Sequence, residues 1–393
     1  MITLIQNGEV YSPDHLGKKD ILCINDKIFK IDKNINIDQK IDLTAKNLQY
    51  NYLDASGKTI IPGIIDQHVH TIGGGGEAGF SSRISEVKLS TLVSGGVTTV
   101  LGLLGTDGTT RSLYTLLAKT RSLEERGITS YMLSGSYEYP SPSITGSIRE
   151  DIILIDKVIG VKIAVSDHRS SYVTVKELAR TVSNARTAGM LSRKAGTATI
   201  HTGSGKDKLD LVFETLSKTD IPIKHFLPTH LNRNETILFE AIKFGKMGGF
   251  IDFTTVPLRK KHHLFSAGEA LKEALICKVP LDNITFSSDG NGSWSKYDKR
   301  GHLTKIGSSS PHSLFQEIRH LITEDNYSIT DAIKPVTLNV AKALHLYPHK
   351  GTLQEKSDAD ILILDKDMNV DTVIARGNFM IKEKKALKKE MFE

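Results

Sequence analysis

Eight short apolar segments recur through the middle of this 393-residue chain, and stretches with helical periodicity separate them. One such stretch is 234–249, where apolar residues repeat at helical spacing and Gly245 is expected to end the helix. Eight strand–helix units fit a closed parallel (β/α)8 barrel of roughly 250 residues. An open doubly wound sheet is the alternative, but no GxGxxG motif opens a first unit. The predicted strands are 64–70, 97–104, 128–134, 158–165, 198–201, 223–230, 249–254 and 284–288.

The two ends of the chain differ from the middle, because both consist of strand-like segments separated by turn residues such as Asn7-Gly8 and Asn25-Asp26. We therefore predict an α/β protein in which a small β-sandwich domain is built from both termini. Its parts are 1–60 and 346–393, and the barrel occupies 61–345. The basic segment 382–390, KEKKALKKE, is expected to be a solvated helix or tail.

Bulk composition excludes several classes of protein. Hydrophobic content of 39% and charged content of 24% are ordinary for a globular protein, and no apolar run is long enough for a membrane helix. The net charge is +6, but no basic stripe is interleaved with aromatics, so a nucleic-acid partner is not expected. Cys23 and Cys277 are far apart, and the first residues resemble a strand rather than a signal peptide. These features predict a cytoplasmic protein.

Polar residues stand at or just after the ends of several predicted strands. His68 and His70 end the first strand, and their i, i+2 spacing places both imidazoles on one face. His201 and His230 end the fifth and sixth, and Asp289 follows the eighth. Because barrel active sites occupy the carboxyl ends of the strands, we expect these side chains to meet. Taken singly, each histidine could be structural and Asp289 could be a turn residue.

Lys162 lies within the fourth predicted strand, on the face that it shares with Val158 and Gly160. A charged lysine inside a barrel is costly, and an ammonium cannot bind a metal. A neutral lysine that has captured CO₂ becomes a carbamate, which acts as a long carboxylate able to bridge two cations. The alternative is a snorkelling or salt-bridged lysine.

Imidazole and carboxylate ligands without thiolates suit zinc. Two metal ions can activate a water and polarise a carbonyl, so the set predicts hydrolysis at a carbonyl or related centre. A carboxylate such as Asp289 could also move the proton of that water.

Several motifs give the chain a family resemblance: PGIIDQHVH, GGGGEAGFSSR, VTTVLGLLGTDGTTR, GSYEYPSPSITGS, VKIAVSDHRSS, TGSG, PTHLNRN and SSDGNGSW. With them the chain resembles the amidohydrolase superfamily and, within it, the isoaspartyl (β-aspartyl) dipeptidases. The resemblance implies two zinc ions bridged by a carboxylated Lys162. One zinc would add His68, His70 and Asp289, and the other His201 and His230.

The same resemblance implies roles around the substrate, a small β-aspartyl dipeptide. Asp289 would shuttle the proton, and Tyr137 would stabilise the oxyanion, although Tyr139 stands nearby. Glu77 would bind the α-ammonium group, and arginines would bind carboxylate, which a guanidinium can hold bidentately. A homo-oligomer, octamers among the forms, is also implied. The substrate-binding positions would be Gly75, Glu77, Thr106, Arg169, Arg233 and Ser293.

Two other functions compete with this one. The metal ligands alone would also suit another amidohydrolase, such as a cyclic-amide hydrolase or an N-acyl amino acid deacylase. Glu77, Tyr137, Arg169 and Arg233 favour a zwitterionic dipeptide instead. A non-catalytic barrel that serves as an assembly module would be expected to lack metal ligands, and all six are present here.

Overall fold

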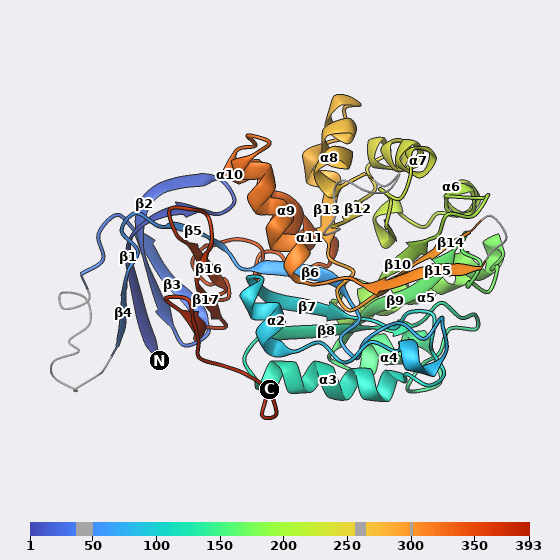
Figure 1. Ribbon diagram of the computed structural model, residues 1–393, viewed down its shortest axis with the longest axis horizontal. Helices are drawn as coiled ribbons and strands as arrows, with labels where there is room; N and C mark the ends of the chain where they lie inside the picture. Colours follow the sequence, from blue (N-terminus) through green and yellow to red (C-terminus); the bar gives the residue numbers. More distant parts are fainter. Residues whose placement is uncertain (37–49, 256–264, 299–301) are drawn as a thin grey trace.

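The computed structural model describes residues 1–36, 50–255, 265–298 and 302–393 (Figure 1). Its centre is a curled parallel sheet in the hydrogen-bonded order β11-β10-β9-β8-β7-β6, beside a parallel pair formed by β12 and β13. Every predicted segment of the middle region overlaps one of these strands, with boundaries that differ by up to three residues. They are β6 (Ile64–Val69), β7 (Val97–Gly102), β8 (Thr129–Gly135), β9 (Val158–Val165), β10 (Thr197–Thr202), β11 (Phe226–Thr229), β12 (Ile251–Thr254) and β13 (Ile284–Ser287).

Helices alternate with these strands, as the periodicity predicted. The longest begins with a capping box, in which Thr174 and Glu177 bond reciprocally to the first backbone N–H groups. The helices are α2 (Leu89–Ser94), α3 (Leu113–Glu125), α4 (Ile148–Leu154), α5 (Val175–Ser192), α6 (Asp210–Ser217), α7 (Glu235–Lys246), α8 (Ala267–Ile276), α9 (His312–Thr323), α10 (Ile329–Ile333) and α11 (Leu338–Ala343). Short 3₁₀ turns are η2 (Phe80–Ser82), η3 (Ile223–His225), η4 (Leu281–Asn283) and η5 (Lys334–Val336).

Two local predictions in this region were wrong. Gly245 does not end α7, because it packs inside the last turn against Val279 and Ile251, and the helix continues to Lys246. Residues 223–225 form η3 rather than the start of a strand, so β11 begins only at Phe226. Pro222 precedes this turn, and apolar periodicity over so few residues cannot separate a turn from a strand.

Strands from both termini form one nine-stranded mixed sheet, at the left of Figure 1, as the prediction of one β-domain from two chain ends requires. Its order is β19-β18-β17-β16-β5-β1-β2-β3, and β4 pairs with β1. β16 runs antiparallel to β5 and so joins the C-terminal strands to the N-terminal ones. The members are β1 (Ile2–Tyr11), β2 (His15–Ile24), β3 (Lys27–Asp32), β4 (Asn51–Asp54), β5 (Thr59–Pro62), β16 (Ile361–Leu364), β17 (Val370–Ala375), β18 (Asn378–Lys382) and β19 (Lys385–Ala386).

The expected turn at Asn7-Gly8 lies inside β1, which is a correction to the sequence analysis. Residues 3–6 of β1 pair with β4, residues 9 and 10 pair with β5, and the register shifts between Ile5 and Gly8. The left-handed φ of 63° at Asn7 therefore marks a bulge in a continuous strand rather than a hairpin. The basic segment 382–390 contains the turn of the β18–β19 hairpin and strand β19 but no helix, so the helical alternative for it was also wrong.

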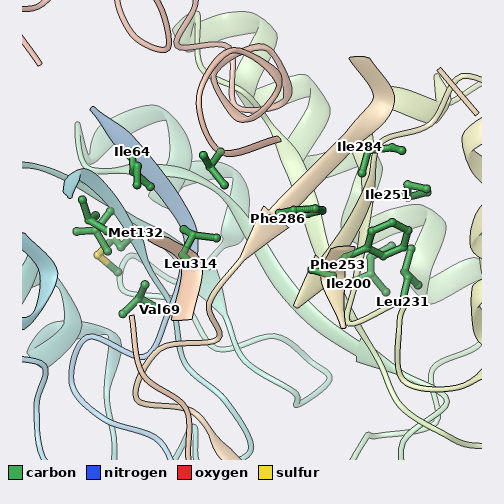
Figure 2. Packing of buried hydrophobic residues seen from close by; sticks show 14 of the residues in the cluster. Ile64, Val69, Met132, Ile200, Leu231, Ile251, Phe253, Ile284, Phe286 and Leu314 are labelled. Carbon is green, nitrogen blue, oxygen red and sulfur yellow. The ribbon is translucent and has the colours of Figure 1, made fainter. Parts of the chain in front are cut away.

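The largest core cluster lies between the central strands and the surrounding helices. Figure 2 shows Ile64, Met132, Ile200 and Phe286 of this cluster, which come from different strands, with Leu314 of α9. Phe253 and Phe286 lie with ring centroids 6.4 Å apart across the β12–β13 pair. Apolar side chains thus fix the positions of the strand ends, where the polar residues stand.

No helix in the described part of the chain combines the length and the apolar character that a membrane crossing needs.

Candidate metal centre and substrate pocket

His68, His70 and Asp289 meet at the carboxyl end of β6. Asp289 Oδ1 lies 3.3 Å from His70 Nε2 and 3.6 Å from His68 Nε2, and the three ligand atoms lie within 4.8 Å of one another. The backbone N–H of His70 donates to the carbonyl of Gly290 at 2.8 Å, which holds the two segments together. The structure thus brings together three of the six predicted ligands as one group that could hold a metal ion.

The other three predicted ligands extend this group. Lys162 Nζ lies 2.9 Å from His68 Nε2, and the His230 ring centroid lies 4.7 Å from those of His68 and His201. Backbone conformation at two of the predicted positions is strained, with φ of 64° at His230 and 50° at Asp289. Strain of this kind concentrates at functional sites.

Burial sets the protonation of this group. It holds the pKa of His68, His201 and His230 well below the usual range, because each charged imidazole would lose its hydration. The same desolvation lowers the pKa of Lys162 to about 7. The neutral imidazoles of His68, His201 and His230 each keep a lone pair free for a cation. The donors therefore fit a divalent metal with nitrogen and oxygen preferences.

His201 is held at both ring nitrogens. Nδ1 lies 2.5 Å from the Tyr137 hydroxyl, and Nε2 lies 2.9 Å from Asp167 Oδ2. Burial raises the pKa of Tyr137 far above its usual value, so its hydroxyl remains a proton donor. A metal bound to His201 at Nδ1 would take the place of that hydroxyl contact, whereas the Asp167 contact could remain.

A pocket opens beside the metal-ligand group. Glu77 Oε1 accepts hydrogen bonds from Ser293 at 2.7 Å, Arg169 at 3.1 Å and Thr106 at 3.4 Å. Glu77 Oε2 is buried and has no partner within the described segments. An open carboxylate oxygen in a pocket is suited to a cationic group. The walls include His70, Gly75, Glu77, Thr106, Tyr137, Arg169, His201, Arg233, Asp289 and Ser293.

Arg233 and Gly75 complete the predicted set. The guanidinium of Arg233 lines the pocket, and its Nε atom is buried with no partner in the parts of the chain that are described. Gly75 lies in a loop that Arg111 supports, since Arg111 donates 2.9 Å hydrogen bonds to the carbonyls of Gly74 and Ile84. Of the two tyrosines, Tyr137 lines the pocket and Tyr139 is not among the described residues that line it.

Sequence reasoning missed three buried residues that organise the site. Arg111 supports the glycine loop, and Asp167 contacts both His201 and Arg169. Asp252 accepts hydrogen bonds from Thr229 and Ser287, both at 2.6 Å, and the Thr229 hydroxyl lies 3.5 Å from His68 Nδ1. Burial raises the pKa of Asp252 to about 6. Arg111 and Asp167 stand in the motifs TDGTTR and SDHRSS, which were the only signal for them.

The chain as a whole is similar to several known proteins. The model of the amidohydrolase family matches residues 59–380. The crystal structure of a β-aspartyl dipeptidase from Fervidobacterium islandicum AW-1, in complex with a β-Asp-Leu dipeptide, is 39% identical with a TM-score of 0.91, and the similarity covers 98% of each chain.

More distant relatives have names that refer to other substrates. The L-hydantoinase of Paenarthrobacter aurescens is 23% identical over 96% of this chain and 88% of its own. The crystal structure of the dihydropyrimidinase of Brevibacillus agri NCHU1002 is 16% identical, with a TM-score of 0.66 and coverage of 99% of this chain and 96% of the other. At that identity the structural likeness shows the fold alone.

Proposed function

The chain belongs to the amidohydrolase family, and on that premise we propose that it is a metal-dependent dipeptidase that hydrolyses the isopeptide bond of β-aspartyl dipeptides. The products are aspartate and a second amino acid. One observation carries the proposal: the pocket beside the metal ligands places the open oxygen of Glu77 near the guanidinium groups of Arg169 and Arg233. A β-aspartyl dipeptide carries one ammonium group and two carboxylates, which matches this distribution of charge.

The proposed metal centre contains two zinc ions. His68, His70 and Asp289 would hold one ion, and His201 and His230 the other. When bound, the ions would polarise the scissile carbonyl and lower the pKa of the attacking water. Ligands without sulfur, neutral imidazoles and the close grouping of His68, His70 and Asp289 support this assignment.

Lys162 would bridge the ions as a carbamate. Its side chain is completely buried, and no carboxylate of the described residues pairs with it within 4 Å. An ammonium in that position would have no carboxylate in direct contact among the described residues, and Asp289 and Asp252 would act on it only from beyond that distance. The neutral amine nitrogen attacks the carbon of CO₂ and loses one proton, which leaves a carbamate with a single negative charge. That product would place an anion beside the histidines that would hold the metal ions.

The chain's own residues would then act as follows. Glu77 binds the α-ammonium group, and the two arginines bind the carboxylates. Gly75, Thr106 and Ser293 contact the aspartyl portion. Tyr137, which remains protonated, donates to the oxygen of the scissile carbonyl as negative charge develops there. Asp289 accepts a proton from the attacking water and returns it to the leaving amine nitrogen.

The activity is tested by hydrolysis of β-Asp-Leu and α-Asp-Leu by purified protein supplied with zinc, beside a chelator-treated sample. We expect cleavage of the β isomer only, and loss of that cleavage in the chelator-treated sample. Hydantoin and dihydroorotate serve as cyclic-amide controls. Cleavage of a cyclic amide with no cleavage of β-Asp-Leu would contradict the dipeptidase proposal and indicate a cyclic-amide hydrolase instead.

For the fold we further propose that the eight strands β6–β13 close into one (β/α)8 barrel over residues 61–345, and that 1–60 and 346–393 form a β-sandwich domain. Two contacts support closure. Leu231 N donates to the Asp252 carbonyl at 3.2 Å between the segments of β11 and β12, and Val69 forms a parallel bridge with Gly290. Gln67 of β6 also donates to Asp252 of β12 at 2.6 Å across the interior.

A further inference from the structure

We propose that Asp167 is a positioning residue that fixes His201 of the metal centre relative to Arg169 of the substrate pocket. The inference rests on the proposed function, because it assigns His201 to the metal and Arg169 to a substrate carboxylate. It adds a residue through which metal binding and substrate binding depend on each other. Asp167 lies two residues beyond β9 and is 6% exposed.

The hydrogen bonds of Asp167 occupy both carboxylate oxygens. Oδ1 accepts from the backbone N–H and the Nε of Arg169, each at 2.9 Å. Oδ2 accepts from Arg169 Nη2 at 2.8 Å and lies 2.9 Å from His201 Nε2. One carboxylate therefore holds a guanidinium bidentately and an imidazole at the same time, a geometry that restricts the rotation of both.

The contact network continues to the other side of the pocket. Arg169 Nη1 donates to Glu77 Oε1 at 3.1 Å, and Ser293 donates to the same oxygen at 2.7 Å. Arg169 thus lies between Asp167 and Glu77. A shift of Asp167 would be passed to the group that we assign to the substrate's ammonium as well as to His201.

The TGSG motif explains how Asp167 reaches His201. A Cβ atom on Gly203 would lie 2.5 Å from the Cβ of Asp167 and 2.3 Å from the Ser166 carbonyl oxygen. A Cβ on Gly205 would lie 2.5 Å from that same oxygen, which accepts the N–H of Gly205 at 2.7 Å. Only residues without side chains allow the loop after β10 to pack this closely on the loop after β9. The two loops meet where Asp167 bonds to His201.

The test uses the zinc-loaded full chain with Asp167→Asn. Asparagine keeps the volume but replaces one acceptor oxygen with an N–H donor, so it cannot accept all four hydrogen bonds that Asp167 receives from Arg169 and His201. We expect zinc affinity and kcat/KM for β-Asp-Leu each to fall about 10–100-fold. We also compare dipeptides in which one carboxylate or the other is replaced by an amide. The wild-type KM penalty for losing the carboxylate that Arg169 binds should shrink in the variant, an effect that a loss of stability alone would not produce.

Two further variants keep the test decisive. Asp371→Asn is the matched control, because Asp371 is buried and ion-paired with Lys58 at 2.8 Å in the terminal sheet. It should lower stability without changing zinc affinity or the KM penalties. Gly203→Ala displaces Asp167 without removing it, so it should lower zinc affinity and shrink the KM penalty as Asp167→Asn does. It therefore still tests the inference if Asp167→Asn does not fold.

Unchanged zinc affinity and unchanged KM penalties in Asp167→Asn would overturn the inference. If the wild-type protein cleaves no β-aspartyl dipeptide, the proposed function fails. The zinc titration of the variants still tests the positioning of His201 in that case, because it needs no substrate. The two failures are therefore distinguishable.

Discussion

At the scale of single residues, burial determines what each group of the site can do. His68, His201 and His230 are kept neutral by desolvation, and Tyr137 is kept protonated for the same reason. Asp289 is more exposed than these groups, with 14% of its side chain accessible. Among the predicted ligands it is therefore the one placed to exchange a proton with a water in the pocket.

Asp289→Asn tests that proton transfer. The amide can still offer an oxygen to a metal but cannot accept a proton, so kcat should fall about 10²–10⁴-fold. Zinc content, measured on the same preparations, should remain near the wild-type value. Near-wild-type turnover in this variant would exclude Asp289 as the proton carrier.

Lys162→Ala tests the carbamate. The variant should lose zinc and activity together, since it leaves the histidines without a bridging anion. Added acetate or propionate should restore part of both, because a small carboxylate can occupy the space that the lysine side chain vacates. Chloride at the same ionic strength is the control and should restore neither. Full activity without any added acid would contradict the bridging role.

At the scale of elements, short irregular segments such as bulges and 3₁₀ turns have structures that periodicity alone does not specify. The bulge at Asn7-Gly8 lets one strand pair with β4 over its first half and with β5 over its second. The turn η3 places His225 against the carbonyl of Gly196, at 3.2 Å, where burial lowers the pKa of its imidazole to about 4. That turn therefore affects stability in a pH-dependent way.

His225→Asn should flatten the pH dependence of the free energy of unfolding. In the unfolded chain this histidine binds a proton below about pH 6.5, whereas in the folded chain it does so only near pH 4. Its contribution to stability is thus present above about pH 6.5 and is lost as the pH falls toward 4. The slope should decrease by at most about 1.4 kcal/mol per pH unit.

Urea unfolding in zinc-free buffer between these pH values measures the effect of His225→Asn. His302→Asn is the control, because the His302 side chain is 72% exposed. An unchanged slope in His225→Asn would show that the imidazole titrates alike in both states.

At the scale of the whole molecule, contacts between the chain ends complete the terminal sheet. Lys350 is 4% exposed and lies 2.7 Å from Asp358 and 2.5 Å from Asp360. Asp358 also pairs with Lys27 of β3, so this buried charge cluster ties the N-terminal strands to the segment that precedes β16. The cytoplasmic location and the oligomeric state stay predictions.

Lys350→Met should lower the free energy of unfolding by about 3–5 kcal/mol, because it leaves buried carboxylates without their cation. Lys384→Met is the matched control. Lys384 lies 2.7 Å from Asp365 but is 59% exposed, so solvent screens the pair and its loss should change stability far less than the loss of Lys350. Chemical denaturation measures both, and zinc affinity should not change in either. Equal effects of the two substitutions would contradict a stabilising role for the buried cluster.

The sequence by itself determined the alternation of strands and helices and the candidates at the strand ends. The reason is that these depend on local spacing: His68 and His70 share a face because side chains alternate along any strand. The motifs also indicated the family to which the chain belongs.

Only the tertiary structure decided which loops meet. Asp167 and His201 are 34 residues apart, and before folding Asp167 resembles any acidic residue that follows a strand. In the sequence Asp252 likewise resembles any other strand residue. Only in the folded chain do the hydroxyls of Thr229 and Ser287 donate hydrogen bonds to it. Such contacts join segments whose separation in the chain carries no periodic signal, so the packing of the core, rather than local spacing, brings them together.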